Sequence, residues 1–205
     1  MALLTTHQVL TQLQLGQPLN QAELSQINLQ EANLDGGQFA HAYLRGANLS
    51  NASCRETNFT DSTLIFAILS GAKLNSANLS GAKLNSANLD GANLREVCAI
   101  HTCFYGANLT RIEASLANFT GADFRESHGQ GANFTHANLD KTNFGAVQLT
   151  DANFSCAKLR HATWESANLI NTSAYQADLE GRRTPGTSRH KESRCWRPPG
   201  PRRAS

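Results

Sequence analysis

Hydrophobic residues recur at every fifth position along most of this chain. The repeated unit is Ala-Asn-Leu followed by two variable residues, and the segment SGAKLNSANL occurs twice in succession, at 70–79 and 80–89. Aligned on the leucine, the repeat has 32 positions from Leu24 to Leu179 without an insertion, and Leu or Phe occupies 26 of them. The residue two places earlier is Ala in 21 of the 32 repeats. This unbroken register indicates a single repeating architecture.

A five-residue period excludes both regular secondary structures. In an α-helix each leucine would be rotated by about 140° from the previous one, so the apolar residues would spiral around every face. In a flat strand an odd period would turn every second leucine toward solvent. The period fits a short extended piece followed by a bend, with Ala and Leu pointing inward together. The residues after the leucine are often Gly, Ser, Thr, Asn or Asp, which favour turns.

Aromatic residues at the leucine position predict the size of one coil. Eight of the nine have an aromatic partner 20 residues away, and Phe119 is the exception. Because stacked coils bring equivalent positions together, this spacing predicts 20 residues, and therefore four sides, per coil. Gly129, whose paired inward residue is Ser127, predicts a locally underpacked or distorted coil. The nine aromatic core positions are Phe39, Phe59, Phe104, Phe119, Phe124, Phe134, Phe144, Phe154 and Trp164.

The repeats resemble those of the pentapeptide repeat family, whose fold is a right-handed quadrilateral β-helix. The resemblance covers residues 22–181, or about eight coils, because the register is unbroken and both inward positions match. It implies an all-β fold, a four-sided parallel β-helix solenoid. The right-handedness is implied by the family and not by the spacing.

The first segment, residues 1–21, is expected to cap the solenoid. A capping-box sequence at 5–8 precedes Val9, Leu10 and Leu13, which have helical spacing. We predict an α-helix over residues 5–15 that covers the first coil, because the open end of a solenoid exposes its core. A membrane-binding helix is the alternative, but this segment contains no Lys or Arg.

The last segment, residues 182–205, differs abruptly in composition from the repeats. It holds eight Lys or Arg residues and one Glu, a net charge of +7, whereas residues 22–181 hold 10 basic and 15 acidic residues, a net charge of −5. The tail is rich in Arg and Pro and lacks apolar periodicity, which predicts disorder or a non-native extension. We expect a nucleic-acid partner only if this basic tail is native.

Candidate catalytic and metal-binding sets are weak. Cys98, His101 and Cys103 lie close in the sequence but lack a fourth ligand at a zinc-like spacing. His136 and Cys156 occupy one column a coil apart, as a nucleophile and its base would, but no orienting carboxylate accompanies them. We therefore expect no catalytic residues, metal ions or cofactors, and a protein that is not an enzyme.

Two sets of residues are candidates for contact with other proteins. Ile65, Phe66 and Ile68 interrupt the polar pattern at one corner and form a candidate partner patch. The last coil, 162–181, has no helix to cover it and would expose an open β edge. It predicts a homodimer through the C-terminal coils, with a dimer end formed by Trp164, Leu169, Ile170, Tyr175 and Leu179.

These patterns favour a binding role in the cytoplasm. The chain has no apolar run of about 18 residues and no basic, apolar leader, so we expect no membrane partner. A rigid solenoid without a cleft favours a scaffold that binds an unidentified protein partner. The family resemblance implies an alternative, since some members imitate DNA, bind DNA gyrase and confer quinolone resistance. That mechanism needs dense anionic columns, and Arg45, Lys73 and Lys83 interrupt those of this chain.

Overall fold

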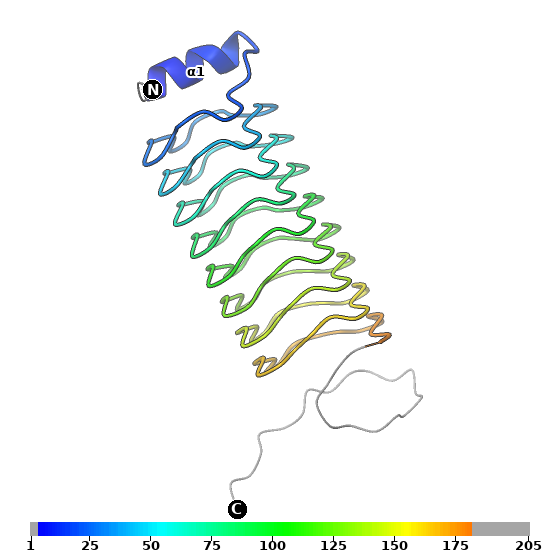
Figure 1. Cartoon of the computed structure of the whole chain (residues 1–205). Coiled ribbons are helices and arrows are strands. Elements are labelled where there is room, and N and C mark those ends of the chain that lie inside the picture. Colours follow the sequence, from blue (N-terminus) through cyan, green and yellow to red (C-terminus); the bar gives the residue numbers. More distant parts are fainter. Residues whose placement is uncertain (1–3, 182–205) are drawn as a thin grey trace, which may run out of the picture.

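A four-sided stack of coils with one helix at its first end makes up the fold (Figure 1). The computed structural model describes residues 4–181. Helix α1 spans Thr6–Gln14, within the predicted 5–15, whose end residues are caps. Parallel bridges join residues 20 positions apart, from Glu23 with Tyr43 to Lys158 with Asp178. The predicted solenoid is confirmed, whereas the prediction for the basic tail lies outside the described residues.

Backbone hydrogen bonds between successive coils hold each side in place. The amide of Leu24 donates to the carbonyl of Tyr43 in the next coil at 2.7 Å, and the amide of Tyr43 donates back to Ala22 at 2.9 Å. The same reciprocal pattern recurs along all four sides. The backbone amides and carbonyls of the extended pieces therefore form hydrogen bonds with the coils above and below them, as buried backbone groups require.

Each corner of the stack uses a left-handed backbone conformation. From Gln21 to Gly181 every fifth residue has a positive φ, and most of these residues are not glycine. At one typical corner the amide of Ala47 donates to the carbonyl of Leu44 at 3.0 Å and closes a β-turn. A non-glycine residue in this conformation costs about 1–2 kcal/mol. Even Phe66 adopts it, with φ at 60°, so the corners accept bulkier residues than turn preferences predict.

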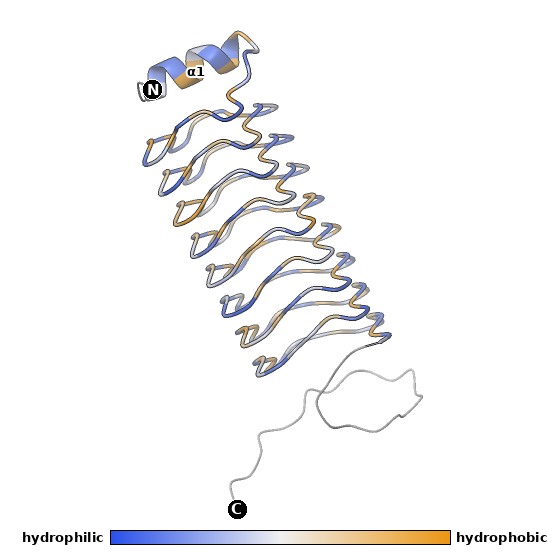
Figure 2. Cartoon of the chain, viewed as in Figure 1, coloured by the Kyte–Doolittle hydropathy of each residue, from blue (hydrophilic) through white to orange (hydrophobic). Residues whose placement is uncertain are grey.

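Small and large inward side chains fill the core along the axis of the stack. Figure 2 shows hydrophobic and hydrophilic residues alternating along the coils, and the Ala and Leu positions of the inner coils are buried. Aromatic rings stack between coils, with centroids 4.9 Å apart for Phe104 and Phe124 and 4.2 Å for Phe144 and Trp164. Phe119, which lacks a partner 20 residues away, contacts Phe104 and Phe124 edge-on at 5.9 and 5.4 Å.

The void expected at Gly129 is absent. A Cβ at this glycine would lie 2.8 Å from Cδ2 of Leu149, so the leucine of the next coil occupies the space. The paired residue Ser127 is fully buried, and its hydroxyl donates to the carbonyl of Phe124 at 2.7 Å. The prediction of an underpacked coil was wrong because it considered one coil alone, whereas the packing extends to the neighbouring coil.

Helix α1 covers the first coil, as the sequence predicts. The Thr5 hydroxyl accepts a hydrogen bond from the amide of Gln8 at 3.3 Å, and the Gln8 side chain accepts one from the amide of Thr5 at 2.8 Å. Val9 is fully buried. The Thr6 hydroxyl donates to the carbonyl of Asn28 in the first coil at 2.8 Å. The helix therefore covers apolar core and satisfies a carbonyl at the edge of the stack.

A substitution pair tests the inward and outward positions. Leu89 is fully buried, so Leu89→Asp places an unpaired carboxylate in the apolar stack and should lower the free energy of unfolding by about 3–5 kcal/mol. In the control Asn88→Asp, the Oδ1 atom keeps its place as acceptor for the amide of Asp90, which lies at 3.1 Å. We expect thermal unfolding of this control to be nearly unchanged; equal losses would contradict the assignment.

Candidate functional site

Where asparagine stands at the middle of an outer side, it caps the corner that follows it. The Oδ1 atom accepts a hydrogen bond from the backbone amide two residues later, as between Asn108 and Thr110 at 3.1 Å. Fourteen corners share this contact. Asn side chains are well suited to such local bonds. Sequence reasoning noted the frequent asparagine but missed its role, which its constant spacing from the corner would have indicated.

One corner departs from this rule in four successive coils. The backbone amides of Arg45, Ile65, Asn85 and Tyr105 have no hydrogen-bond acceptor among residues 4–181. The residues two places before them are Tyr, Thr, Lys and Cys instead of Asn. We call these four amides the donor row. They occupy the same place at their corners as the capped amides, so they lie at the outer surface.

The coils on either side of the donor row show which group such an amide binds. Glu23 accepts from the amide of Ser25 at 2.9 Å, and Asp123 accepts from the amide of Arg125 at 3.1 Å. Hydrogen bonds from Ser25 lower the pKa of Glu23. Partial burial opposes the same shift for Asp123, but the hydrogen bonds from Arg125 outweigh it and lower the pKa. The side chains of Ser25 and Arg125 lower these pKa values more than their amides do, so the two contacts show only that a corner amide can donate to a carboxylate.

Exposed apolar side chains gather at the same corner. Phe66 is 53% exposed, Ile68 is 41% exposed and Ile65 is half-buried. Tyr43, one coil earlier, is 51% exposed. The guanidinium carbon of Arg45 lies 5.0 Å from the centroid of the Phe66 ring, within the range of a cation–π contact. We call these five residues the apolar corner; it contains all three members of the predicted partner patch.

The last coil leaves its outer edge open within the described residues. The amides of Trp164, Leu169 and Leu179 have no acceptor among residues 4–181, whereas their equivalents in earlier coils donate to the next coil. These three side chains are only partly buried. Ile170 and Tyr175 are 58% and 57% exposed. The five residues of the predicted dimer end thus belong to a single coil that combines apolar side chains with unsatisfied amides.

The predicted cysteine and histidine sets do not form a site. Among residues 4–181, no three His, Cys, Asp or Glu side chains gather closely enough to hold a metal ion. The Cys156 thiol lies 3.7 Å from Oε1 of Gln176, and no hydrogen bond joins it to His136 in this part of the chain. The Cys98 thiol contacts the Ser80 hydroxyl at 3.2 Å. Each thiol therefore contacts a neutral side chain of an adjacent coil.

Cys54 differs from the other thiols because it occupies a leucine position. It is fully buried. Burial raises the pKa of its thiol to about 12, and the negative charge of Asp35 adds to this shift. Because the thiolate is the reactive form of cysteine, this side chain is a core residue that stays protonated at neutral pH.

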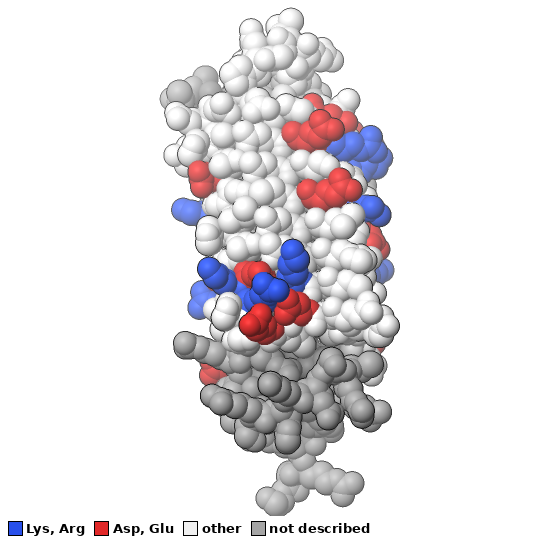
Figure 3. Space-filling model, turned by 90° about the vertical axis from the view of Figure 1, so that its right-hand side faces the viewer, with Lys and Arg blue, Asp and Glu red and all other residues white. Residues whose placement is uncertain are grey.

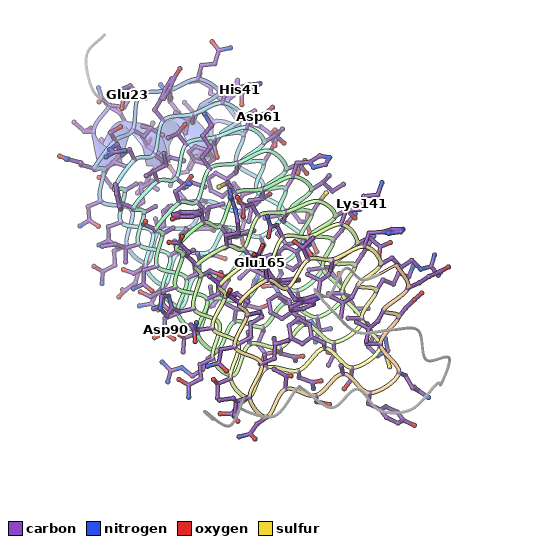
Figure 4. All side chains as sticks on the ribbon, turned by 60° about the horizontal axis from the view of Figure 1, so that its bottom comes forward. Glu23, His41, Asp61, Asp90, Lys141 and Glu165 are labelled. Carbon is purple, nitrogen blue, oxygen red and sulfur yellow. The ribbon has the colours of Figure 1, made fainter. Side chains whose placement is uncertain are left out.

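A pocket of about 720 Å³ lies where Leu4 meets the first two coils, and Glu23, His41 and Tyr43 line it. Figure 4 shows Glu23, His41 and Asp61 near the same end of the stack, and His41 Nδ1 lies 4.0 Å from Asp61 Oδ2. Sequence reasoning did not foresee this pocket. Among the described residues its lining contains no cysteine, serine or lysine, and Glu23, His41 and Tyr43 are its chemically versatile side chains.

Charged side chains are sparse on the described surface, and several are paired. Arg111 binds Asp90 at 2.8 Å, and Arg160 binds Asp178 at 2.7 Å. Figure 3 shows basic and acidic side chains intermixed in small groups, separated by wide uncharged areas. This face has no continuous anionic column. No helix among residues 4–181 has the length and apolar character needed to cross a membrane.

Comparison with known proteins identifies the family. The chain matches the family description "Pentapeptide repeats (8 copies)" over residues 19–46, 38–75, 72–111, 115–145 and 148–181, and it belongs to this family. A comparison with curated proteins finds no relative.

Solved structures share the fold. One is full-length QnrB1, a plasmid-mediated fluoroquinolone resistance protein, which is 19% identical, with 81% of this chain and 90% of that chain covered and a TM-score of 0.57. Another is HetL, a pentapeptide repeat protein of the cyanobacterium Nostoc sp. strain PCC 7120 involved in heterocyst differentiation regulation. It is 24% identical, with 87% of this chain and 94% of that chain covered and a TM-score of 0.45.

Proposed function

We propose that this protein is a non-enzymatic, cytoplasmic scaffold that binds a protein partner through the apolar corner. The observation that carries the proposal is that three of the seven large hydrophobic side chains exposed among residues 4–181, Tyr43, Phe66 and Ile68, lie together at one corner. An aromatic ring with an arginine over it is the kind of anchor that dominates protein interfaces. Members of this family are generally non-catalytic, which agrees with a binding role.

The construction of the stack suits such a role. Every side is tied to its neighbours by backbone hydrogen bonds, so the outer surface is preorganised before a partner arrives. A preorganised surface loses less conformational entropy on binding than a flexible one. Enzymes usually enclose their substrates in a concave pocket lined by convergent groups, whereas the described thiols and imidazoles of this chain do not converge.

We further propose a homodimer through the last coil. Its open amides and its exposed Ile170 and Tyr175 form an edge on which another β structure can add. A two-fold contact closes after two subunits and so does not grow into a fibre. Helix α1 occupies the opposite end of the stack, so among residues 4–181 only the last coil lacks a covering element.

DNA mimicry is the second candidate function, and its support is the shared fold with QnrB1. At 19% identity this likeness concerns the fold alone. Imitation of DNA requires a dense negative field that resembles rows of phosphates. Pairing of Arg111 with Asp90 and of Arg160 with Asp178 cancels acidic charge on this surface. The charge distribution therefore favours the scaffold.

The patch prediction compares partner binding with stability. Replacement of Ile65, Phe66 and Ile68 together by Ser should abolish partner recovery in an affinity pull-down from the source cell, because the apolar contact area is removed. Thermal unfolding should change little, since Phe66 and Ile68 are exposed. Leu116→Ser is the control, because Leu116 is 52% exposed at a different corner. Unchanged recovery with the Ser variant would contradict the proposal.

The DNA-mimic alternative makes a distinct prediction. A mimic inhibits DNA gyrase in a supercoiling titration, whereas we expect the full chain to leave supercoiling unchanged at micromolar concentrations because its acidic residues are too sparse. Inhibition that weakens in the variant Glu31→Gln, Asp35→Asn, Glu56→Gln would favour DNA mimicry over the scaffold function.

The dimer prediction concerns association in solution. Light scattering should show a dimer for residues 1–181 and a weaker dimer for the full chain, because Arg182 and Arg183 follow the last coil and repel their copies. Added salt should strengthen the full-length dimer by screening this repulsion. A 1–181 chain that stays monomeric at about 100 µM, well above the Kd of an interface worth about 7–8 kcal/mol, would exclude the interface.

A further inference from the structure

The donor row and the apolar corner coincide in space. Both lie at the same corner, the donor row from the second to the fifth coil and the apolar corner in the second and third, and Ile65 contributes its amide to the first and its side chain to the second. The loss of the Asn cap and the gain of exposed apolar groups are separate departures from the repeat. An uncapped amide forgoes a hydrogen bond worth about 0.5–1.5 kcal/mol. Four such losses in register mark this corner as a surface with a specific use.

The charge of this corner complements an acidic ligand. None of its outward residues in the second to fifth coils is Asp or Glu, whereas Arg45 and Lys83 are present. Neither cation has a carboxylate within 4.0 Å among residues 4–181, unlike Arg125 at the same corner of the sixth coil, which pairs with Asp123 at 2.7 Å. The corner therefore offers hydrogen-bond donors and positive charge, but within the second to fifth coils no carboxylate of its own.

The chain itself provides a template for the missing contact. Glu23 and Asp123 cap the equivalent amides in the coils that flank the donor row, so a carboxylate fits this position sterically and electrostatically. We propose that the donor row receives the carboxylates of an acidic segment of a partner protein, while Phe66 and Ile65 pack against an apolar side chain of that segment. This inference rests on the scaffold function and specifies the chemistry of its partner.

Single-stranded nucleic acid is the other ligand that combines negative charge with flat apolar groups. Such ligands are usually held by a continuous basic groove and several stacking rings. The donor row spans four coils with only Arg45 and Lys83 as cations, and two side chains of the apolar corner, Ile65 and Ile68, are aliphatic. An acidic peptide with an apolar anchor is therefore the better match.

A displayed library of random 12-residue peptides, selected against the immobilised full chain, tests the ligand chemistry. We expect the recovered peptides to be enriched in Asp and Glu together with Phe, Leu or Trp, and their affinity to fall as NaCl rises from 50 to 500 mM. Recovery of peptides without acidic enrichment, or of none that compete for the apolar corner, would overturn the proposal. So would tighter binding of a fluorescent oligothymidine at this corner.

Restored caps provide the sharper test. The double variant Thr63→Asn, Cys103→Asn gives the amides of Ile65 and Tyr105 the internal acceptor found at fourteen other corners. Fluorescence anisotropy with a selected acidic peptide should show affinity weakened by about tenfold. The melting temperature should stay the same or rise, so misfolding cannot account for the loss.

The matched control is His128→Asn, Gln148→Asn, which adds two caps at a different corner. Its melting temperature should behave like that of the first variant, and its peptide affinity should equal that of the unmodified chain. Unchanged affinity in the Thr63→Asn, Cys103→Asn variant would overturn the role of the donor row. If the Ser patch variant loses its cellular partner while no acidic peptide binds, the scaffold function stands and the partner chemistry proposed here fails.

Discussion

The hydrogen bonds between equivalent positions of successive coils are the interaction on which this structure depends. Each extended piece is too short to be stable alone. Its backbone amides and carbonyls form hydrogen bonds only when the next coil lies directly beneath it. This requirement explains why the register runs without insertion from Leu24 to Leu179. It also explains why many non-glycine residues adopt positive φ at corners, since the bonds on both sides of a corner offset the strain that each incurs.

A stack built in this way has few places for function. Its interior is filled by Leu, Ala and Phe, and its sides are straight, so recognition must use the outer sides, the corners or the two ends. Asparagines that cap corners occupy 14 of the 32 middle positions on the outer sides, and these side chains are already engaged. Surfaces become available only where the repeat is broken, as at Phe66 and along the donor row. Departures from the repeat are thus more informative about function than the repeat itself.

The two ends of the stack differ in the same physical terms. At the first end, α1 buries Val9 and satisfies the carbonyl of Asn28. At the last coil, the amides of Trp164 and Leu179 have no acceptor among residues 4–181. The described part of the chain is therefore asymmetric along its axis, because α1 covers the first sheet edge and no element of residues 4–181 covers the last one. Within residues 4–181 an uncovered sheet edge occurs at one end only, while the apolar corner lies on the side.

The sequence alone determined the coil size, the inward positions, the capping helix and the corner carrying Ile65, Phe66 and Ile68, because these follow from periodicity and from stacking of residues 20 apart. Three features required the tertiary structure. Leu149 fills the space at Gly129, Phe119 packs edge-on, and the amides of Arg45, Ile65, Asn85 and Tyr105 lack caps. Each depends on the distances between side chains and backbone groups of neighbouring coils, and the periodicity of the sequence does not contain these distances.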